Sequence, residues 1–147
     1  MSKIPVTFIE IRLFAHATED LNKVTEAVKQ IFSKDYTEEV EFKRTNLKGH
    51  YGNPITLFET KIKEGKIIRA FVDSLFSRIS VIDKENLSKE INLHVEKGSL
   101  YLRLDKQAAL CGEIKLCTKD PIRVRIRFKK RGMEDILKVC REFEMLP

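Results

Sequence analysis

A strict alternation of apolar and basic residues near the end of the chain fixes one piece of the fold. In residues 121–129, Ile122, Val124, Ile126 and Phe128 alternate with Arg123, Arg125 and Arg127. Successive side chains of a β-strand point to opposite faces of the sheet. The segment therefore predicts a strand with one buried and one solvated face. Sheets that leave one face in water are typically antiparallel, with helices packed on the other face.

The remaining elements follow from the same kind of pattern. Alternation predicts strands over 5–17, 39–46, 55–63 and 99–104, and a further one over 113–117. Helical spacing predicts helices from a Thr18 N-cap to about residue 32, over 66–80, from an Asp83 cap to about residue 92, from an Asp105 cap to 110, and over 133–144. The chain has no internal repeat and no linker. We therefore predict one domain, 1–147, of the α+β class. It would be a two-layer sandwich with helices on one face of a mixed, largely antiparallel sheet.

The composition excludes several classes of protein. A chain of 147 residues that is 42% hydrophobic can bury a core and is not disordered. Apolar runs stay well short of the roughly 18 residues that cross a bilayer. Glu10 and Arg12 interrupt the apolar N-terminal segment, which argues against a signal peptide. We expect a cytoplasmic protein without membrane contact.

Motifs for metal binding and catalysis are not found in the sequence. Cys111, Cys117 and Cys140 form no closely spaced pair, and the three histidines lie far apart. Phosphate-binding glycine loops and the common hydrolase motifs are also missing. We therefore expect no metal, no cofactor and no enzymatic activity.

The net charge of +6 is a local feature. Residues 121–131 hold six basic residues and no acidic one, and the rest of the chain balances 22 against 22. On a strand, alternate arginines recur about every 6.5–7 Å, and each guanidinium can hold phosphate oxygens with two donors. This density favours nucleic-acid contact over a merely solvated strand face. The candidate residues are Arg123, Arg125, Arg127, Lys129, Lys130 and Arg131.

Two other segments supply candidate nucleic-acid-binding residues. The predicted hairpin carries Lys43, Arg44, Lys48 and, at its tip, His50 and Tyr51, where an aromatic ring can stack on an unpaired base. Alternatively, the tip is only a turn, with Tyr51 packed on its own hairpin. Arg103 and Lys106 flank the end of the 99–104 strand and complete the list. Whether the hairpin and residues 121–131 share one surface is left open.

The second face of the first strand has a mixed character. It carries Phe8, Glu10, Arg12, Phe14 and His16. Aromatic and basic side chains together are typical of RNA-binding sheets. We interpret this face instead as rim packing or a subunit contact.

Three motifs, FIEIRLFAHATED (8–20), GHYGNPI (49–55) and YLRLDKQAA (101–109), resemble an archaeal family of small predicted RNA-binding proteins. The family is also described as exosome-associated, and the resemblance spans nearly the whole chain, including the strand at 121–129. It implies an α+β fold similar to that of a ribosomal protein that binds ribosomal RNA. RNA is the implied ligand, and an exosome or ribosome-related complex is the implied partner. Leu110 and Cys111 stand where the family commonly has an aromatic residue, and the family supplies no catalytic residues.

We therefore predict a non-enzymatic RNA-binding protein that contacts the phosphate backbone through its basic strand. Its role would be that of an accessory factor in RNA processing or degradation. The alternative is a structural or adaptor subunit of a protein complex, a homodimer or larger homo-oligomer. In that case the basic strand would meet an acidic protein surface rather than RNA.

Overall fold

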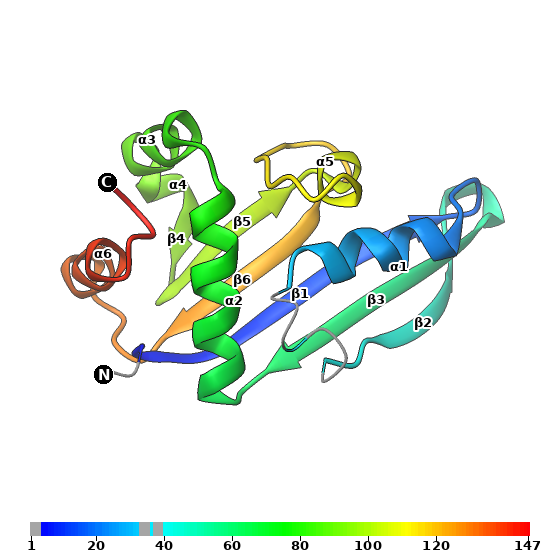
Figure 1. The fold of residues 1–147 in the computed structure, drawn as a ribbon. Coiled ribbons are helices and arrows are strands. Elements are labelled where there is room, and N and C mark those ends of the chain that lie inside the picture. Colours follow the sequence, from blue (N-terminus) through cyan, green and yellow to red (C-terminus); the bar gives the residue numbers. More distant parts are fainter. Residues whose placement is uncertain (1–3, 33–35, 37–39) are drawn as a thin grey trace.

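The computed structural model describes residues 4–32, 36 and 40–147. These residues form a six-stranded sheet in the order β2-β3-β1-β6-β5-β4, and every pair of neighbouring strands is antiparallel. Figure 1 shows the sheet with the longest strand, β1, near its middle. The strands are β1 (Val6–His16), β2 (Lys43–Lys48), β3 (Pro54–Ile62), β4 (Val95–Glu96), β5 (Ser99–Leu104) and β6 (Ile122–Phe128).

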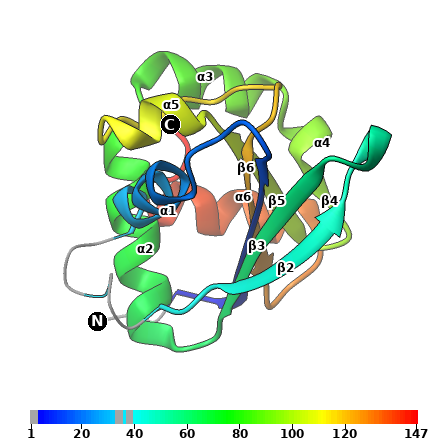
Figure 2. The ribbon, with the colours of Figure 1, turned by 90° about the vertical axis from the view of Figure 1, so that its right-hand side faces the viewer.

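The larger helices pack on one face of this sheet. Figure 2 shows α1, α2 and α6 on the same side of the strands. The predicted α+β architecture is therefore confirmed. The helices are α1 (Leu21–Gln30), α2 (Gly65–Arg78), α3 (Val81–Lys89), α4 (Ile91–His94), α5 (Lys106–Leu110) and α6 (Met133–Glu142), and the 3₁₀ turn η1 (His50–Gly52) joins β2 to β3.

The core lies between the helices and the inner face of the sheet. The inward residues of β1 and β6 are almost completely buried, as the alternation predicts: Ile9, Ile11, Leu13, Ala15, Ile122, Val124, Ile126 and Phe128. The amphipathic helix α2 supplies Phe71, Val72 and Leu75 to the same core. Because all the inward positions of β6 are apolar, its three arginines are confined to the outer face.

Two helix N-caps were predicted two or three residues away from their true positions. Thr18 lies in the turn before α1, and the cap is Asp20, whose Oδ1 accepts a hydrogen bond from the Asn22 backbone N at 2.9 Å. Ser80 caps α3, because its Oγ accepts from the backbone N of Asp83 at 3.1 Å. Asp83 therefore lies inside the first turn of α3, where a carboxylate also favours the helix dipole. The Asp105 cap of α5 is confirmed by its bond from the Gln107 backbone N.

Other predicted boundaries also change. The 113–117 segment is not a regular strand, because its pairing consists of isolated bridges from Ile114 to Ile79 and from Leu116 to Leu104. The helix predicted to end near residue 92 is two helices, α3 and α4, and the short strand β4 was not predicted. Strand β2 begins at Lys43, and residue 39, where it was predicted to begin, lies outside the described residues. Within the described part of the chain, every helix is too short or too polar to cross a membrane.

Candidate nucleic-acid interface

The outer face of the sheet, which we call the open face, gathers basic side chains from five of its strands. Residues directly opposite one another in neighbouring strands share a face. Starting from Arg123 of β6, the register therefore assigns residues of β1, β3, β5 and β2 to the same side. The cations of the open face are Arg12, Lys43, Lys61, Arg103, Arg123, Arg125 and Arg127, and they outnumber its acids Glu10, Glu59 and Glu96.

Three arginines lie in one row across the middle of the open face. Arg123 is paired with Arg12 of β1 on one side and with Arg103 of β5 on the other. We call these residues the arginine row. Opposite residues of an antiparallel pair have Cβ atoms about 4.5–5.5 Å apart, and like charges in such pairs destabilise the sheet. An anionic ligand would remove this repulsion.

Only one end of the arginine row has a carboxylate partner. Arg12 Nε lies 3.5 Å from Glu59 Oε2, and both side chains are partly exposed. For Arg103 and Arg123, both exposed, no ion pair or side-chain hydrogen bond occurs within the described part of the protein. The row therefore presents at least two guanidiniums whose donors face solvent.

The next row along the strands combines a fixed arginine with an aromatic ring. Arg125 is opposite Tyr101 of β5 and Glu10 of β1. Its Nε donates to Ser99 Oγ at 3.0 Å, and its guanidinium carbon lies 5.3 Å from the Phe8 ring centre and 5.7 Å from that of Tyr101. Lys61 Nζ lies 4.2 Å from the same Phe8 ring. Phe8 is thus engaged by two cations, whereas Tyr101 keeps 39% of its surface exposed.

The remaining basic residues at the end of β6 differ in their surroundings. Arg127 is half-buried and donates from Nη1 to the backbone carbonyl of Lys97, so it holds the β4–β5 turn. Lys129, Lys130 and Arg131 are exposed in the connection to α6. Lys130 Nζ lies 4.0 Å from Asp135 Oδ1, a marginal ion pair on the surface.

The hairpin residues divide between the two faces of the sheet. Lys43 is opposite Glu59 on the open face. Arg44 is on the helical face, where its guanidinium lies 5.0 Å from the Phe58 ring and 3.5 Å from Thr25 Oγ1. The structure therefore separates Arg44 from the other candidates.

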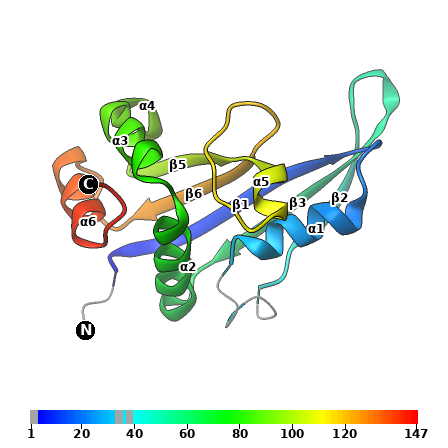
Figure 3. The ribbon, with the colours of Figure 1, turned by 45° about the horizontal axis from the view of Figure 1, so that its top comes forward.

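The tip of the β2–β3 hairpin extends past the end of β1, as Figure 3 shows. Tyr51 lies at this tip with 91% of its surface exposed and with a positive φ of 66°. Lys48 is also exposed there. The backbone of His50 belongs to η1, but its side chain lies outside the described part of the structure.

Lys106 has an internal role. Its side chain is only 9% exposed, and its Nζ lies 3.2 Å from Glu19 Oε1 and 2.9 Å from Asp120 Oδ2. It also donates to the carbonyl of Phe14. Partial burial favours a higher pKa for Asp120, but hydrogen bonds from Lys106 and His16 outweigh it and lower the pKa of this carboxyl. Lys106 thus joins β1, α5 and the loop before β6. Its ammonium is buried in these contacts and is not presented to solvent on the open face.

Replacing Lys106 tests this internal role. We expect Lys106→Met to lower the free energy of unfolding by about 1–3 kcal/mol, because two carboxylates and a carbonyl lose a common donor. Affinity for any nucleic acid bound on the open face should stay within about twofold, since the ammonium is buried and already paired with two carboxylates. Urea denaturation and RNA titration measure the two effects. The exposed Lys119→Met variant is the control. An unchanged unfolding midpoint with a large loss of affinity would contradict this role.

The same cluster contains the best arrangement of metal ligands among the described residues. Ligand atoms of His16, Glu19 and Asp120 lie within 4.8 Å of one another. However, the ammonium of Lys106 pairs with both carboxylates, so the cluster already holds a cation. Two of the three thiols are disfavoured as nucleophiles: burial raises the pKa of Cys140 to about 12, and burial followed by the charge of Asp105 raises the pKa of Cys117.

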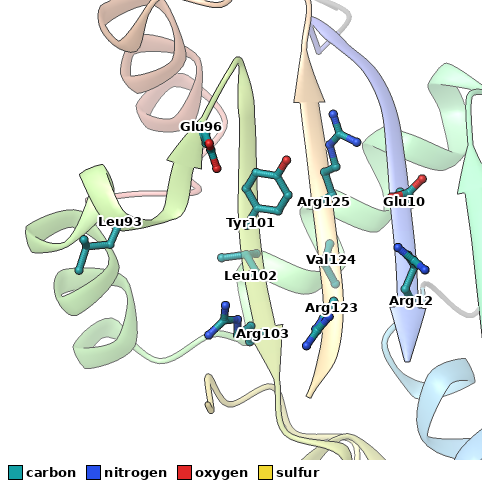
Figure 4. A pocket seen from close by; sticks show the side chains of 10 residues that line it. All are labelled: Glu10, Arg12, Leu93, Glu96, Tyr101, Leu102, Arg103, Arg123, Val124 and Arg125. Carbon is teal, nitrogen blue, oxygen red and sulfur yellow. The ribbon is translucent and has the colours of Figure 1, made fainter. Parts of the chain in front are cut away.

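A hollow of about 470 Å³ lies on the open face over β6, β5 and α4. It is lined by arginine-row residues, by the Arg125 and Tyr101 pair, and by Glu10, Leu93 and Glu96. Figure 4 shows Arg125 on one side of the Tyr101 ring, and Glu96 and Leu93 on the other. Sequence reasoning missed three residues here. Arg12 is on a strand face that we interpreted as rim packing or a subunit contact, and Glu96 and Tyr101 were not among the candidates. The alternation in β1 was the available signal for Arg12.

Comparison with known proteins gives a consistent result. Residues 8–128 match the model of a family described as RNA binding. The chain is 38% identical over 146 residues to the RNA-binding protein PAB1135 of Pyrococcus abyssi, covering 96% of this chain and 95% of the relative. The crystal structure of protein AF2318 from Archaeglobus fulgidus, of family DUF54, superposes with a TM-score of 0.76 at 30% identity, over 92% of this chain and 99% of that one.

A second solved structure agrees. The DUF54 protein Mth689 from Methanothermobacter thermautotrophicus superposes with a TM-score of 0.73 at 26% identity, over 91% of this chain and 97% of that protein. The matched residues 8–128 include the strands β1, β3, β5 and β6, which carry most of the open face. The chain belongs to the RNA-binding family, whose members include archaeal proteins of this fold.

Proposed function

We propose that this protein binds RNA through the open face of its sheet and contacts the phosphate backbone with the arginine row. The arginine row carries the proposal: three guanidiniums are opposite one another on adjacent strands, and Arg103 and Arg123 have no carboxylate partner in the described part of the chain. Repulsion within the row is a cost to folding. Phosphates bound by bidentate guanidinium contacts would offset that cost.

The rest of the open face fits the same ligand. Lys43 and Lys61 extend the positive surface towards the β2–β3 hairpin, whose tip presents Tyr51. Such a surface can follow a backbone across several nucleotides, with aromatic rings available for unpaired bases. Contacts of this kind depend on charge and give only modest sequence selectivity.

The name of the family and that of the Pyrococcus abyssi relative both support RNA as the ligand class and describe binding rather than catalysis. We further propose that the protein acts as an accessory factor in RNA processing or degradation. Association with an exosome or ribosome-related complex, a cytoplasmic location and a homodimer stay predictions from the sequence.

The salt dependence of binding tests the proposal. We expect the logarithm of the association constant for a single-stranded RNA to fall linearly with the logarithm of salt, by about 0.7 for each phosphate contacted. Arg123→Gln should make this slope shallower by about 0.7 and weaken binding to all sequences alike. Fluorescence anisotropy at salt concentrations from about 50 to 200 mM measures both quantities.

A lysine on the helical layer gives the matched control. Lys29 is exposed on α1, and Lys29→Gln removes the same unit of charge. We expect the slope of this variant to equal that of the wild type. Binding that does not depend on salt, or equal slopes for Arg123→Gln and the wild type, would refute phosphate contact by the arginine row.

A further inference from the structure

The hollow beside Tyr101 contains an acid that phosphate binding does not explain. Glu96 of β4 is opposite Ser99 of β5 and is exposed on the open face. Its carboxylate makes no ion pair or hydrogen bond within the described residues. A free carboxylate repels phosphate, so the backbone of a bound RNA would not follow this edge of the face. Hydrogen-bond donors on a base, in contrast, would be attracted to it.

The neighbours of Glu96 have the shape and polarity of a slot for a base. One side of the Tyr101 ring faces Arg125, and Leu93 and Glu96 lie on the other side (Figure 4). Leu93 is 81% exposed, although it is apolar and lines the hollow. A base stacked on Tyr101 would lie in the hollow that this leucine also lines. Stacking on an aromatic ring is the usual way in which an unpaired base is held.

The walls of this slot are held in place before any ligand binds. His94 of α4 donates from Nδ1 to the backbone carbonyl of Tyr101 at 3.2 Å, which ties α4 to β5. The β4–β5 turn is fixed by the bond from Arg127 to the Lys97 carbonyl. Leu93 and Glu96 therefore lie on segments that are anchored to β5 and β6, so little ordering is needed when a base enters.

The arginine row lies beside the slot, at a distance that one nucleotide can span. Arg103 follows Tyr101 by two residues on the same face of β5, which corresponds to about 6.5–7 Å. A nucleotide with its base on Tyr101 can therefore place a neighbouring phosphate on Arg103 and Arg123. The slot and the row together form one nucleotide subsite with an apolar, an acidic and a basic part.

We propose that this subsite selects an unpaired guanine in RNA, an inference that rests on the proposed RNA binding. The carboxylate of Glu96 accepts hydrogen bonds only. Guanine offers it two adjacent donors, N1–H and the N2 amino group, which match the two carboxylate oxygens. Adenine and cytosine offer an amino group beside a ring acceptor. Uracil offers one N–H between two carbonyl oxygens, which the carboxylate repels.

A single-base series tests the selection. The probe is a short, labelled oligouridine RNA with a central guanine, inosine or uracil, and the readout is fluorescence anisotropy with the wild-type protein. Inosine differs from guanine only by the missing N2 amino group. We expect guanine to bind about tenfold more tightly than inosine, because the missing amino group removes one contact to a charged acceptor. Inosine should bind more tightly than uracil, because its N–H has one neighbouring carbonyl oxygen to repel the carboxylate and that of uracil has two.

Variants assign the effect to residues. In Glu96→Gln the preference for guanine over inosine should fall to within about twofold. The control is Glu85→Gln, which replaces an exposed acid on α3 and should keep the preference of the wild type. Tyr101→Ala should weaken binding of the guanine probe by about tenfold, and Tyr101→Phe should retain it. Retention of the preference in Glu96→Gln would overturn the assignment of Glu96.

The outcomes separate this inference from the function on which it rests. Equal affinity of the wild type for the three probes, with the expected salt slope, overturns guanine selection and leaves RNA binding intact. Failure to bind any of the probes overturns both.

Discussion

Reversal of the arginine row in Arg12→Glu, Arg103→Glu, Arg123→Glu should reduce the affinity for single-stranded RNA by about 100- to 1,000-fold at physiological salt. Each solvent-exposed, salt-screened contact to phosphate is worth about 0.5–1.5 kcal/mol, and the glutamates add repulsion of the backbone. Anisotropy titration measures the loss. The corresponding Gln variant should lose less, about 30-fold, because it removes attraction without adding repulsion.

The control for this variant reverses the same amount of charge on the helical layer. Lys23, Lys29 and Lys89 are exposed on α1 and α3. Their triple Glu variant should lose less than about fivefold, because a Debye length of about 8 Å at physiological salt screens those positions from RNA on the open face. Circular dichroism establishes that both variants fold. Equal losses in the two variants would mean that only net charge matters and that the open face is not the binding surface.

Replacement of Arg78 should have the largest effect on stability. Its side chain is half-buried at the end of α2, with Nη1 2.7 Å from the Gln30 carbonyl oxygen and Nη2 3.0 Å from that of Ile31. Nε donates to the Ser74 carbonyl at 3.1 Å. Burial lowers the pKa of Arg78 from its ordinary value, but the group stays charged. It therefore neutralises the negative end of the α1 dipole and caps its last carbonyls.

We expect Arg78→Ala to lower the free energy of unfolding by about 3–4 kcal/mol, since several buried acceptors lose their donor at once. In urea this corresponds to a shift of the midpoint by about 2 M at an m-value near 2 kcal/mol/M. Arg78→Lys should recover only part of the lost stability, because one ammonium cannot reach all the acceptors that the planar guanidinium binds. Arg141→Ala, an exposed position on α6, should change stability by less than about 0.5 kcal/mol. A midpoint for Arg78→Ala equal to that of Arg141→Ala would refute this role.

Local pattern was sufficient to predict most of the fold. The alternation in β1 and β6 located both strands and their buried faces to within one or two residues. Prediction failed where the decisive contacts were between distant segments. Residues 114 and 116 form only isolated bridges, because each pairs with a different segment, at residue 79 and at residue 104, and neither pairing extends into a ladder. Cap positions were misplaced where several capping residues stood close together, as with Thr18 and Asp20.

The candidate site was predictable only in part, for the same reason. A single strand revealed Arg123, Arg125 and Arg127, but the arginine row depends on strand order and register, which bring Arg12 and Arg103 beside Arg123. The charge of a residue was by itself a poor guide to whether its side chain belongs to the site. Lys106 looks like a surface cation in the sequence, although Glu19 and Asp120, distant in the chain, enclose it. Arg44 alternates with Lys43 along β2 and is therefore on the opposite face.

The close spacing of the arginine row has a consequence for dissecting it one residue at a time. Neutralising Arg123 would remove the proposed phosphate contact, but it would also relieve repulsion between Arg123 and each of its two neighbours in the free protein. Double-mutant cycles between Arg123 and either neighbour should therefore give coupling energies different from zero, while cycles with a distant lysine should not. On the proposed function, the three guanidiniums would act as one composite group, and RNA would supply the counter-charge that Arg103 and Arg123 lack among the described residues.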